Sequence, residues 1–267
     1  MNGPELPASG AGSGPDDAAE ITDDAFLGGR LACLQPRFGF RAGLDTVLLA
    51  AACPAGEGET VVEPGCGPGV AALCLAHRTG ARVTGIEIEP AAAALARENA
   101  ARNDLAARVC VIDADVTAKP AALEALGLAA GSFDHAIANP PYLIEGAATP
   151  PPGAARARAF AGDADLTDAW LRVCVRLVRP GGSIAVIHRA DRLAGLLAAF
   201  EGRAGGLRVL PLWPGGGKPA SRVIVCGIKG SRAPLTLLPG LVLHSENDGR
   251  FMPEVAAILR EGTALGM

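Results

Sequence analysis

The sequence lacks the features that would place this chain in a membrane or in an oxidising compartment. None of its apolar runs approaches the roughly 18 residues that a membrane-spanning helix needs, and the amino-terminal stretch has neither the basic nor the apolar region of a secretory signal. The seven cysteines include no C-x-x-C pair and lie mostly in apolar runs, which predicts free thiols, no disulfide and no zinc. We therefore expect a cytoplasmic protein without membrane or metal partners.

Lysine and aromatic residues are also scarce, because only three of the 24 basic residues are lysine and the chain has a single tyrosine. A net charge of −4 argues against a protein that coats nucleic acid by bulk electrostatics. The charge is uneven: residues 1–150 hold 9 basic against 19 acidic residues, and residues 151–267 hold 15 against 9. The basic second half is typical of a surface that faces phosphates, although heavy arginine use also follows from a GC-rich genome.

The order of segments predicts four regions. Residues 1–20 have the composition of a disordered tail, and residues 21–55 predict a hairpin followed by an apolar helix. Residues 56–232 alternate apolar strands with alanine-rich helices, and residues 233–267 form an extension that we expect to pack on this domain. We expect strands near 59–63, 82–87, 108–113, 133–138, 183–188, 207–213 and 222–228, and helices near 69–79, 90–103, 120–126, 166–178 and 190–202.

This alternation predicts an α/β fold: a doubly wound, Rossmann-like, mostly parallel seven-stranded sheet with an antiparallel last strand. The strands are apolar on both faces, which is typical of central strands in such a sheet. The short hairpin module precedes the sheet. Its simplest role is structural, to cover one edge of the sheet.

Two consecutive prolines end the apolar run 133–138, in the stretch Asn139-Pro140-Pro141-Tyr142. Prolines fix φ near about −65° and lack backbone donors, so the strand cannot continue inside a sheet. The chain leaves the sheet with the side-chain carbonyl of Asn139 and the backbone carbonyl of Pro140 as adjacent acceptors, and with the Tyr142 ring beside them. This arrangement suits a planar amine, and the alternative is an ordinary turn before proline.

A glycine-rich turn, Glu63-Pro64-Gly65-Cys66-Gly67-Pro68-Gly69, follows the first regular strand, where a doubly wound sheet binds its ligand. Its glycines permit positive φ and let a ligand lie against the backbone. Glu87 closes the next strand about 20 residues further on, a spacing at which a carboxylate accepts the ribose hydroxyls of a nucleoside. A dinucleotide fingerprint would need a glycine at position 70, which is Val70.

Together these motifs resemble the class I S-adenosylmethionine-dependent methyltransferases, and more closely the bacterial tRNA (adenine-N(6)) methyltransferase family that acts on a valine tRNA anticodon loop. The resemblance runs from about Ile21 to the end of the chain. The residues that carry it are Gln35-Pro36, Gly39-Phe40-Arg41-Ala42-Gly43-Leu44-Asp45, Glu63-Pro64-Gly65-Cys66-Gly67, Glu87, Asp115 and Asn139-Pro140-Pro141-Tyr142.

The resemblance implies S-adenosylmethionine as cofactor, tRNA as partner and methylation of an adenine amino group. It assigns catalysis to Asn139, Pro140 and Tyr142, with Pro141 at the substrate and Tyr142 stacking on a base that has left its loop. It also assigns cofactor binding to Glu63, Gly65, Gly67, Glu87, Asp115, Arg41 and Asp45.

Three further residues are candidates for contact with RNA phosphate. Arg156 and Arg158 lie in a proline-preceded loop beside the amine pocket, and a solvated loop is their alternative. His188 ends a strand at the same sheet edge, and a strand-end hydrogen bond is its favoured alternative. His77 and His135 have no carboxylate or cysteine at ligand spacing, which is the residue-level reason that we predict no metal site.

Other functions fit the same motifs. A protein glutamine amide presents the same planar NH₂ group, and so does adenine in DNA; the basic second half and the small amino-terminal module favour nucleic acid. A nucleotide-binding protein without catalysis is the more distant alternative.

Overall fold

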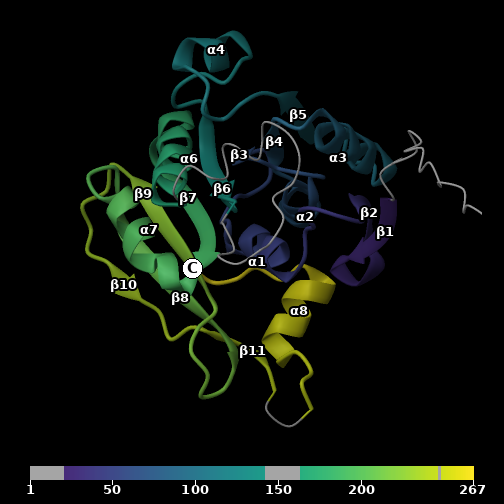
Figure 1. The fold of residues 1–267 in the computed structure, drawn as a ribbon, viewed down its shortest axis with the longest axis vertical. Helices are drawn as coiled ribbons and strands as arrows, with labels where there is room; N and C mark the ends of the chain where they lie inside the picture. Colours follow the sequence, from purple (N-terminus) through teal and green to yellow (C-terminus); the bar gives the residue numbers. More distant parts are fainter. Residues whose placement is uncertain (1–20, 142–162, 246–247) are drawn as a thin grey trace, which may run out of the picture.

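The computed structural model describes residues 21–141, 163–245 and 248–267, in which a small two-stranded sheet lies beside one large sheet (Figure 1). The tail expected at residues 1–20 lies outside the described residues. The strands are β1 (Ile21–Phe26), β2 (Leu31–Pro36), β3 (Thr60–Pro64), β4 (Arg82–Glu87), β5 (Val109–Asp113), β6 (Phe133–Ala138), β7 (Val178–Arg189), β8 (Ala204–Gly215), β9 (Arg222–Lys229), β10 (Thr236–Leu237) and β11 (Leu241–His244). The helices are α1 (Leu44–Ala52), α2 (Val70–Thr79), α3 (Pro90–Arg102), α4 (Pro120–Ala125), α6 (Asp163–Leu177), α7 (Leu193–Phe200) and α8 (Pro253–Glu261), with short 3₁₀ turns η1 (Leu27–Gly29) and η2 (Ala190–Arg192).

The large sheet has the strand order β10-β8-β9-β7-β6-β3-β4-β5, and β11 pairs with β8. Only β9 runs antiparallel to its neighbours β7 and β8, whereas the other pairings are parallel. The predicted Rossmann-like sheet with an antiparallel last strand is confirmed, and so is the amino-terminal hairpin β1–β2. The division of the chain into four regions stays a prediction.

The predicted number of seven strands was too low, because the carboxyl-terminal extension adds β10 and β11 to give a nine-stranded sheet. Both short strands pair with β8, which would otherwise expose a whole strand edge. The chain steps between them at Gly240, where φ is +93° and an added Cβ would lie 2.2 Å from Nε1 of Trp213. Two-residue and four-residue strands are too short to show a periodic pattern in the sequence.

Alternate residues of the central strands enter two separate cores, one on each face of the sheet. Val61 of β3 and Ile137 of β6 belong to the core that α1, α2 and α8 complete, whereas Val62 belongs to the core beneath α6 and α7. Helices cover both faces of the sheet (Figure 1), which explains why the central strands are apolar on both faces.

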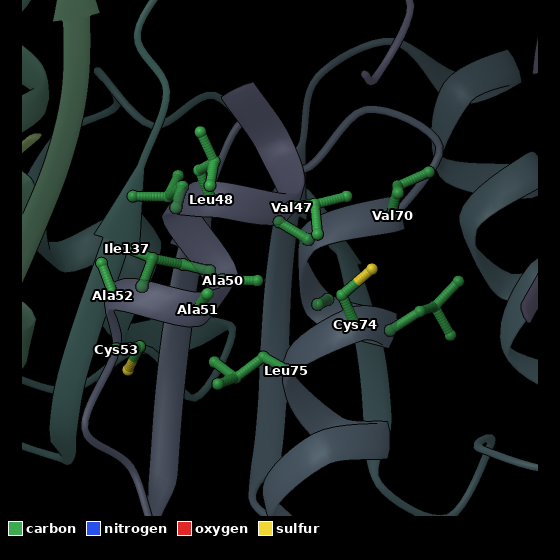
Figure 2. Packing of buried hydrophobic residues seen from close by; sticks show 14 of the residues in the cluster. Val47, Leu48, Ala50, Ala51, Ala52, Cys53, Val70, Cys74, Leu75 and Ile137 are labelled. Atoms are coloured by element: carbon green, nitrogen blue, oxygen red, sulfur yellow. The ribbon is translucent and has the colours of Figure 1, made fainter. Parts of the chain in front are cut away.

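Helix α1 is apolar on nearly all sides and is buried over most of its length. Figure 2 shows its side chains, including Val47 and Leu48, in one cluster with Leu75 of α2 and Ile137 of β6. The end of the chain packs here too, since the Leu265 N–H donates to the Ala51 carbonyl at 2.8 Å. No helix in the described ranges is long and apolar enough to cross a membrane.

Asp134 holds three central strands together at the amino-terminal edge of the sheet. Its Oδ2 accepts hydrogen bonds from the backbone N–H and the hydroxyl of Thr60, at 2.9 and 2.8 Å, and its Oδ1 accepts one from Arg179 at 2.7 Å. These bonds, that of Arg179 above all, lower the pKa of the Asp134 carboxyl. The side chain is a quarter exposed, so solvent weakens the ion pair.

We predict that Asp134→Ala lowers the free energy of unfolding by about 1–3 kcal/mol at neutral pH, because three hydrogen bonds to one carboxylate are lost. A lowered pKa contributes stability above the ordinary aspartate pKa of about 3.9, and this contribution is lost as the pH falls below that value. Urea unfolding from pH 7 down to pH 3 is the measurement. Glu98→Ala, which removes an exposed carboxylate, is the control, and an equal loss in both variants would contradict the prediction.

Candidate active site at the carboxyl edge of the sheet

The predicted site residues follow strands that lie side by side in the sheet. β3 pairs with β4 on one side and with β6 on the other. The connections from β3 and β6 therefore leave in opposite directions, and a crevice forms at such a point outside the carboxyl ends of the strands. The glycine-rich turn follows β3, Glu87 ends β4 and Asn139 follows β6, so the structure brings these three features to the same edge.

The turn after β3 folds back on the sheet through its glycines. Gly65 and Gly67 have φ values of +64° and +54°, and the N–H groups of Gly65 and Cys66 both donate to the Ile86 carbonyl, at 2.7 and 3.1 Å. A Cβ on Gly65 would lie 2.1 Å from Cη2 of Trp170. Glycine is therefore required here both by the backbone and by the buried indole against it.

Glu87 supports this turn directly. Its Oε2 accepts the Gly67 N–H at 2.7 Å, and its Oε1 accepts the N–H groups of Ile88 and Glu89 at 2.8 and 2.9 Å. A carboxylate has about four acceptor positions, so Oε2 keeps room for one further donor. The sequence predicted only the ribose contact, which stays a prediction; the structure adds that Glu87 joins β4 to the glycine-rich turn.

Glu63 is buried at the end of β3, and its Oε2 has no hydrogen-bond partner. The pKa of Glu63 is raised to about 8, chiefly by burial; a hydrogen bond from the Ala72 backbone opposes the shift, and the nearby Glu87 charge adds to it. A buried, unpartnered acceptor is costly unless a ligand pairs with it. The chemistry of this oxygen fits a cationic amino group.

Asp115 follows β5, the outermost strand on this side. Its Oδ1 accepts the backbone N–H and the hydroxyl of Thr117, at 2.8 and 2.7 Å. The carboxylate thus closes its own turn, and its assigned contact with the adenine of a cofactor stays a prediction.

A cavity of about 250 Å³ opens at this edge. It is lined by Phe40, Arg41, Gly43, Leu44, Asp45, Thr46 and Asn139. Three residues predicted from the sequence, Arg41, Asp45 and Asn139, therefore meet in one cavity although they come from distant segments. The Phe40 ring also reaches the glycine-rich turn, with Cδ1 and Cε1 3.4 Å from the position of a Cβ on Gly67.

The loop that forms one wall of this cavity is fastened to the hairpin. Buried Gln35 of β2 accepts the Ala42 N–H at 2.8 Å and donates to the Ala42 carbonyl at 3.3 Å. Arg41 donates to the Thr22 hydroxyl and the Pro36 carbonyl, both at 2.8 Å, and pairs with Asp24. The hairpin thus positions the cavity wall, which goes beyond the simple covering of a sheet edge.

Asn139 lies half-buried at the cavity. Its side-chain amide makes no hydrogen bond to any residue in the described parts of the chain. Pro140 is buried and Pro141 is exposed, and neither has a backbone N–H, so the strand ends in acceptors. Asp45, on the opposite wall, is held by Arg222 Nε at 2.7 Å.

The remaining candidates divide into two groups. Tyr142, Arg156 and Arg158 lie outside the described residues. His188 is 1% exposed, its Nδ1 accepts the Arg189 N–H at 2.9 Å and its Nε2 lies 3.3 Å from the Thr167 hydroxyl. This burial argues against the proposed phosphate contact and supports the alternative of a strand-end hydrogen bond.

Sequence reasoning missed several contributors to the site. In the sequence Phe40 stands out only as part of a motif, and nothing near Trp170 or Arg222 signals their contacts with Gly65 and Asp45. The one clue in the sequence was a pair of phenylalanines in a glycine-spaced, arginine-flanked loop. Among the described residues, no three His, Cys, Asp or Glu side chains are grouped to hold a metal ion.

Comparison with known proteins gives the family. The methyltransferase domain profile matches residues 55–201. A tRNA1(Val) (adenine(37)-N6)-methyltransferase from Aeromonas hydrophila is 32% identical over 170 residues, which are 62% of this chain and 67% of that protein. One of the same name from Dickeya chrysanthemi is 27% identical over 84% of this chain and 88% of that protein.

Among solved structures, a predicted O-methyltransferase from Agrobacterium tumefaciens superposes with a TM-score of 0.71 at 30% identity, over 83% of this chain and 98% of that one. The resemblance read from the motifs is confirmed by these findings. The chain belongs to the S-adenosylmethionine-dependent methyltransferases, in the family of the proteins named tRNA1(Val) (adenine(37)-N6)-methyltransferase.

Proposed function

We propose that this enzyme methylates the exocyclic amino group of an adenine in RNA, and that a tRNA is its substrate. The observation that carries the proposal is the position of Asn139 at the cavity beside the glycine-rich turn, where its amide makes no hydrogen bond to a described residue. The names of the relatives add tRNA as the substrate class. We place the reaction in the cytoplasm, with neither a metal nor a membrane taking part.

S-adenosylmethionine supplies an electrophilic methyl group on a sulfonium. The residues that would hold it are Glu63, Glu87 and the backbone of the turn that contains Gly65 and Gly67. The buried, unpartnered Oε2 of Glu63 fits the amino group of its methionine part, and the remaining acceptor position on Glu87 Oε2 fits a ribose hydroxyl. Asp115, Arg41 and Asp45 complete this assignment by resemblance.

The acceptor amine would be held by two oxygens from the strand end. Asn139 Oδ1 and the Pro140 carbonyl each accept one N–H of the amine, so its lone pair is directed away from them. An adenine amino nitrogen is a weak nucleophile because its lone pair is delocalised into the ring. Two hydrogen bonds to acceptors favour the pyramidal nitrogen and disperse the positive charge that develops during transfer. The displaced proton leaves to solvent from the strongly acidic methylated amine.

Positioning supplies the rest of the catalysis. Methyl transfer is an in-line displacement between two bound reactants, and holding them in contact contributes much of the rate. The chain provides rigid walls for this purpose: Gln35 fixes the cavity loop, and Trp170 fixes the glycine-rich turn. In this proposal Tyr142 stacks on the target base and Arg156 and Arg158 contact phosphate.

Transfer of a radiolabelled methyl group is the direct test of the substrate class. We expect label from S-adenosylmethionine in total tRNA taken from a strain without this gene, and N(6)-methyladenosine after digestion. Total DNA and a protein extract from the same strain are the parallel substrates. Label in protein alone would replace the proposal with methylation of a glutamine amide, and label in DNA alone would replace RNA with DNA.

We predict that Asn139→Ala lowers kcat by about 100- to 1,000-fold, the range for loss of one oriented polar group at a reacting centre. The affinity for S-adenosylmethionine, measured by calorimetry without RNA, stays within twofold. Asn139→Asp is the matched variant, because it keeps an acceptor oxygen and should retain more activity than alanine. An equal collapse of cofactor affinity in the alanine variant would remove Asn139 from the acceptor side.

Glu63→Gln tests the buried carboxyl, whose pKa in the folded protein is about 8. The folded state retains a proton that the unfolded chain loses near its ordinary pKa of about 4.3. Protonated Glu63 therefore contributes fully to the stability of the wild type below the ordinary pKa, and this contribution is lost as the pH rises through the raised pKa. Without cofactor, the glutamine variant should therefore gain stability over the wild type from about pH 5 to pH 8.

Urea unfolding at each pH measures this difference, and calorimetry at about pH 8 should show weaker binding of S-adenosylmethionine to the glutamine variant. If the free energy of unfolding depends on pH in the same way in both proteins, the raised pKa of Glu63 is refuted. Unchanged cofactor affinity would separate Glu63 from the cofactor.

A further inference from the structure

The loop after β2 presents two phenylalanine rings to solvent in the stretch Arg37-Phe38-Gly39-Phe40-Arg41. Phe38 is 76% exposed and Phe40 is 56% exposed. Phe38 is the most exposed large apolar side chain in the described part of the chain. Burying such a ring stabilises a protein by about 1.5–3 kcal/mol. Two exposed rings on one loop, in a chain with ten aromatic residues, therefore indicate a contact surface.

The two rings occupy different positions at the site. Phe40 lines the cavity with Asn139 and reaches toward Gly67, so it belongs to the wall around the reacting groups. Phe38 does not line the cavity. Only Gly39 separates Phe38 from Phe40 in the chain, so Phe38 adjoins a residue that lines the cavity, a position that we call its outer rim. The parts of a large substrate next to the reacting group would pass there.

This rim is held firmly despite its exposure. Gln35 and Ala42 exchange two hydrogen bonds across the base of the loop, and Arg41 is tied to Thr22, Pro36 and Asp24. The chain turns at Gly39, where φ is +92°. A ring on an anchored loop loses little freedom when a ligand packs on it, which favours binding.

We propose that Phe38 is a stacking platform for an RNA base next to the target adenine, an inference that rests on the proposed function. An adenine that enters the cavity must leave the stack of its loop, so a neighbouring base loses a stacking partner. An exposed aromatic ring at the rim replaces that partner, which is how single-stranded RNA is usually held. The charge of Arg41 is already paired with Asp24, so the exposed rings, and not Arg41, are the expected contribution of this loop to RNA binding.

The test uses an unmethylated anticodon stem-loop RNA of tRNA1(Val), the substrate in the relatives' name, at saturating S-adenosylmethionine. Phe38→Ala should raise KM for this RNA by about 5- to 150-fold, the cost of one lost stacking contact. The kcat and the cofactor affinity should stay within twofold, and Phe38→Trp should restore KM. Leu237→Ala is the matched control, since Leu237 is 66% exposed on β10, outside the site.

A second measurement identifies the stacked base. The nucleotides on either side of the target adenine are replaced in turn by abasic residues, and KM for each RNA is measured with the wild type and with Phe38→Ala. If Phe38 stacks on one of these bases, removing that base raises KM much less in Phe38→Ala than in the wild type.

The stacking role would be overturned if Phe38→Ala leaves KM unchanged, or if its effect on KM and that of the abasic substitution simply add at both positions. Methylation of RNA by the wild type would still support the proposed function. If the wild type transfers no methyl group to RNA, both the proposed function and the stacking role are wrong. If the wild type instead methylates a protein substrate and Phe38→Ala does not, the rim is a protein-docking surface.

Discussion

The reversal of strand order between β3 and β6 is the constraint on which this structure depends. Neighbouring parallel strands end at one edge, and connections that leave in opposite directions cannot fill the space between them. The glycine-rich turn, Glu87 and Asn139 all border that space. These features lie close together in space although they are far apart in the chain, because the sheet fixes where each strand ends.

The hairpin β1–β2 and helix α1 form the second wall of the same space. Gln35 and Arg41 carry the position of the hairpin into the loop 37–43, and Asp45 at the start of α1 is paired with Arg222 of β9. The cavity thus joins the amino-terminal module, the centre of the sheet and its antiparallel strand. A change in the packing of α1 would therefore be felt at the cavity wall.

The site also contains groups whose arrangement costs stability. Glu63 is a buried acid with an unpartnered oxygen, and Phe38 and Phe40 are apolar rings held in water. In a fold with two well-packed cores these costs are tolerable, and binding of ligand would offset them. A ligand that pairs with an unsatisfied group relieves its cost, and functional sites are where folds tolerate such groups.

The sequence by itself determined the alternation of strands and helices, the doubly wound sheet, and the positions of the glycine-rich turn, Glu87 and Asn139. These features are local: apolar runs, glycines and prolines act on the chain within a few residues of themselves. The tertiary structure alone decided that β10 and β11 extend the sheet, that His188 is buried, and that Phe40 meets Gly67. It alone also decided that Arg222 holds Asp45, 177 residues away in the chain. Such contacts depend on how whole elements pack against each other, and no period or spacing along the chain records them.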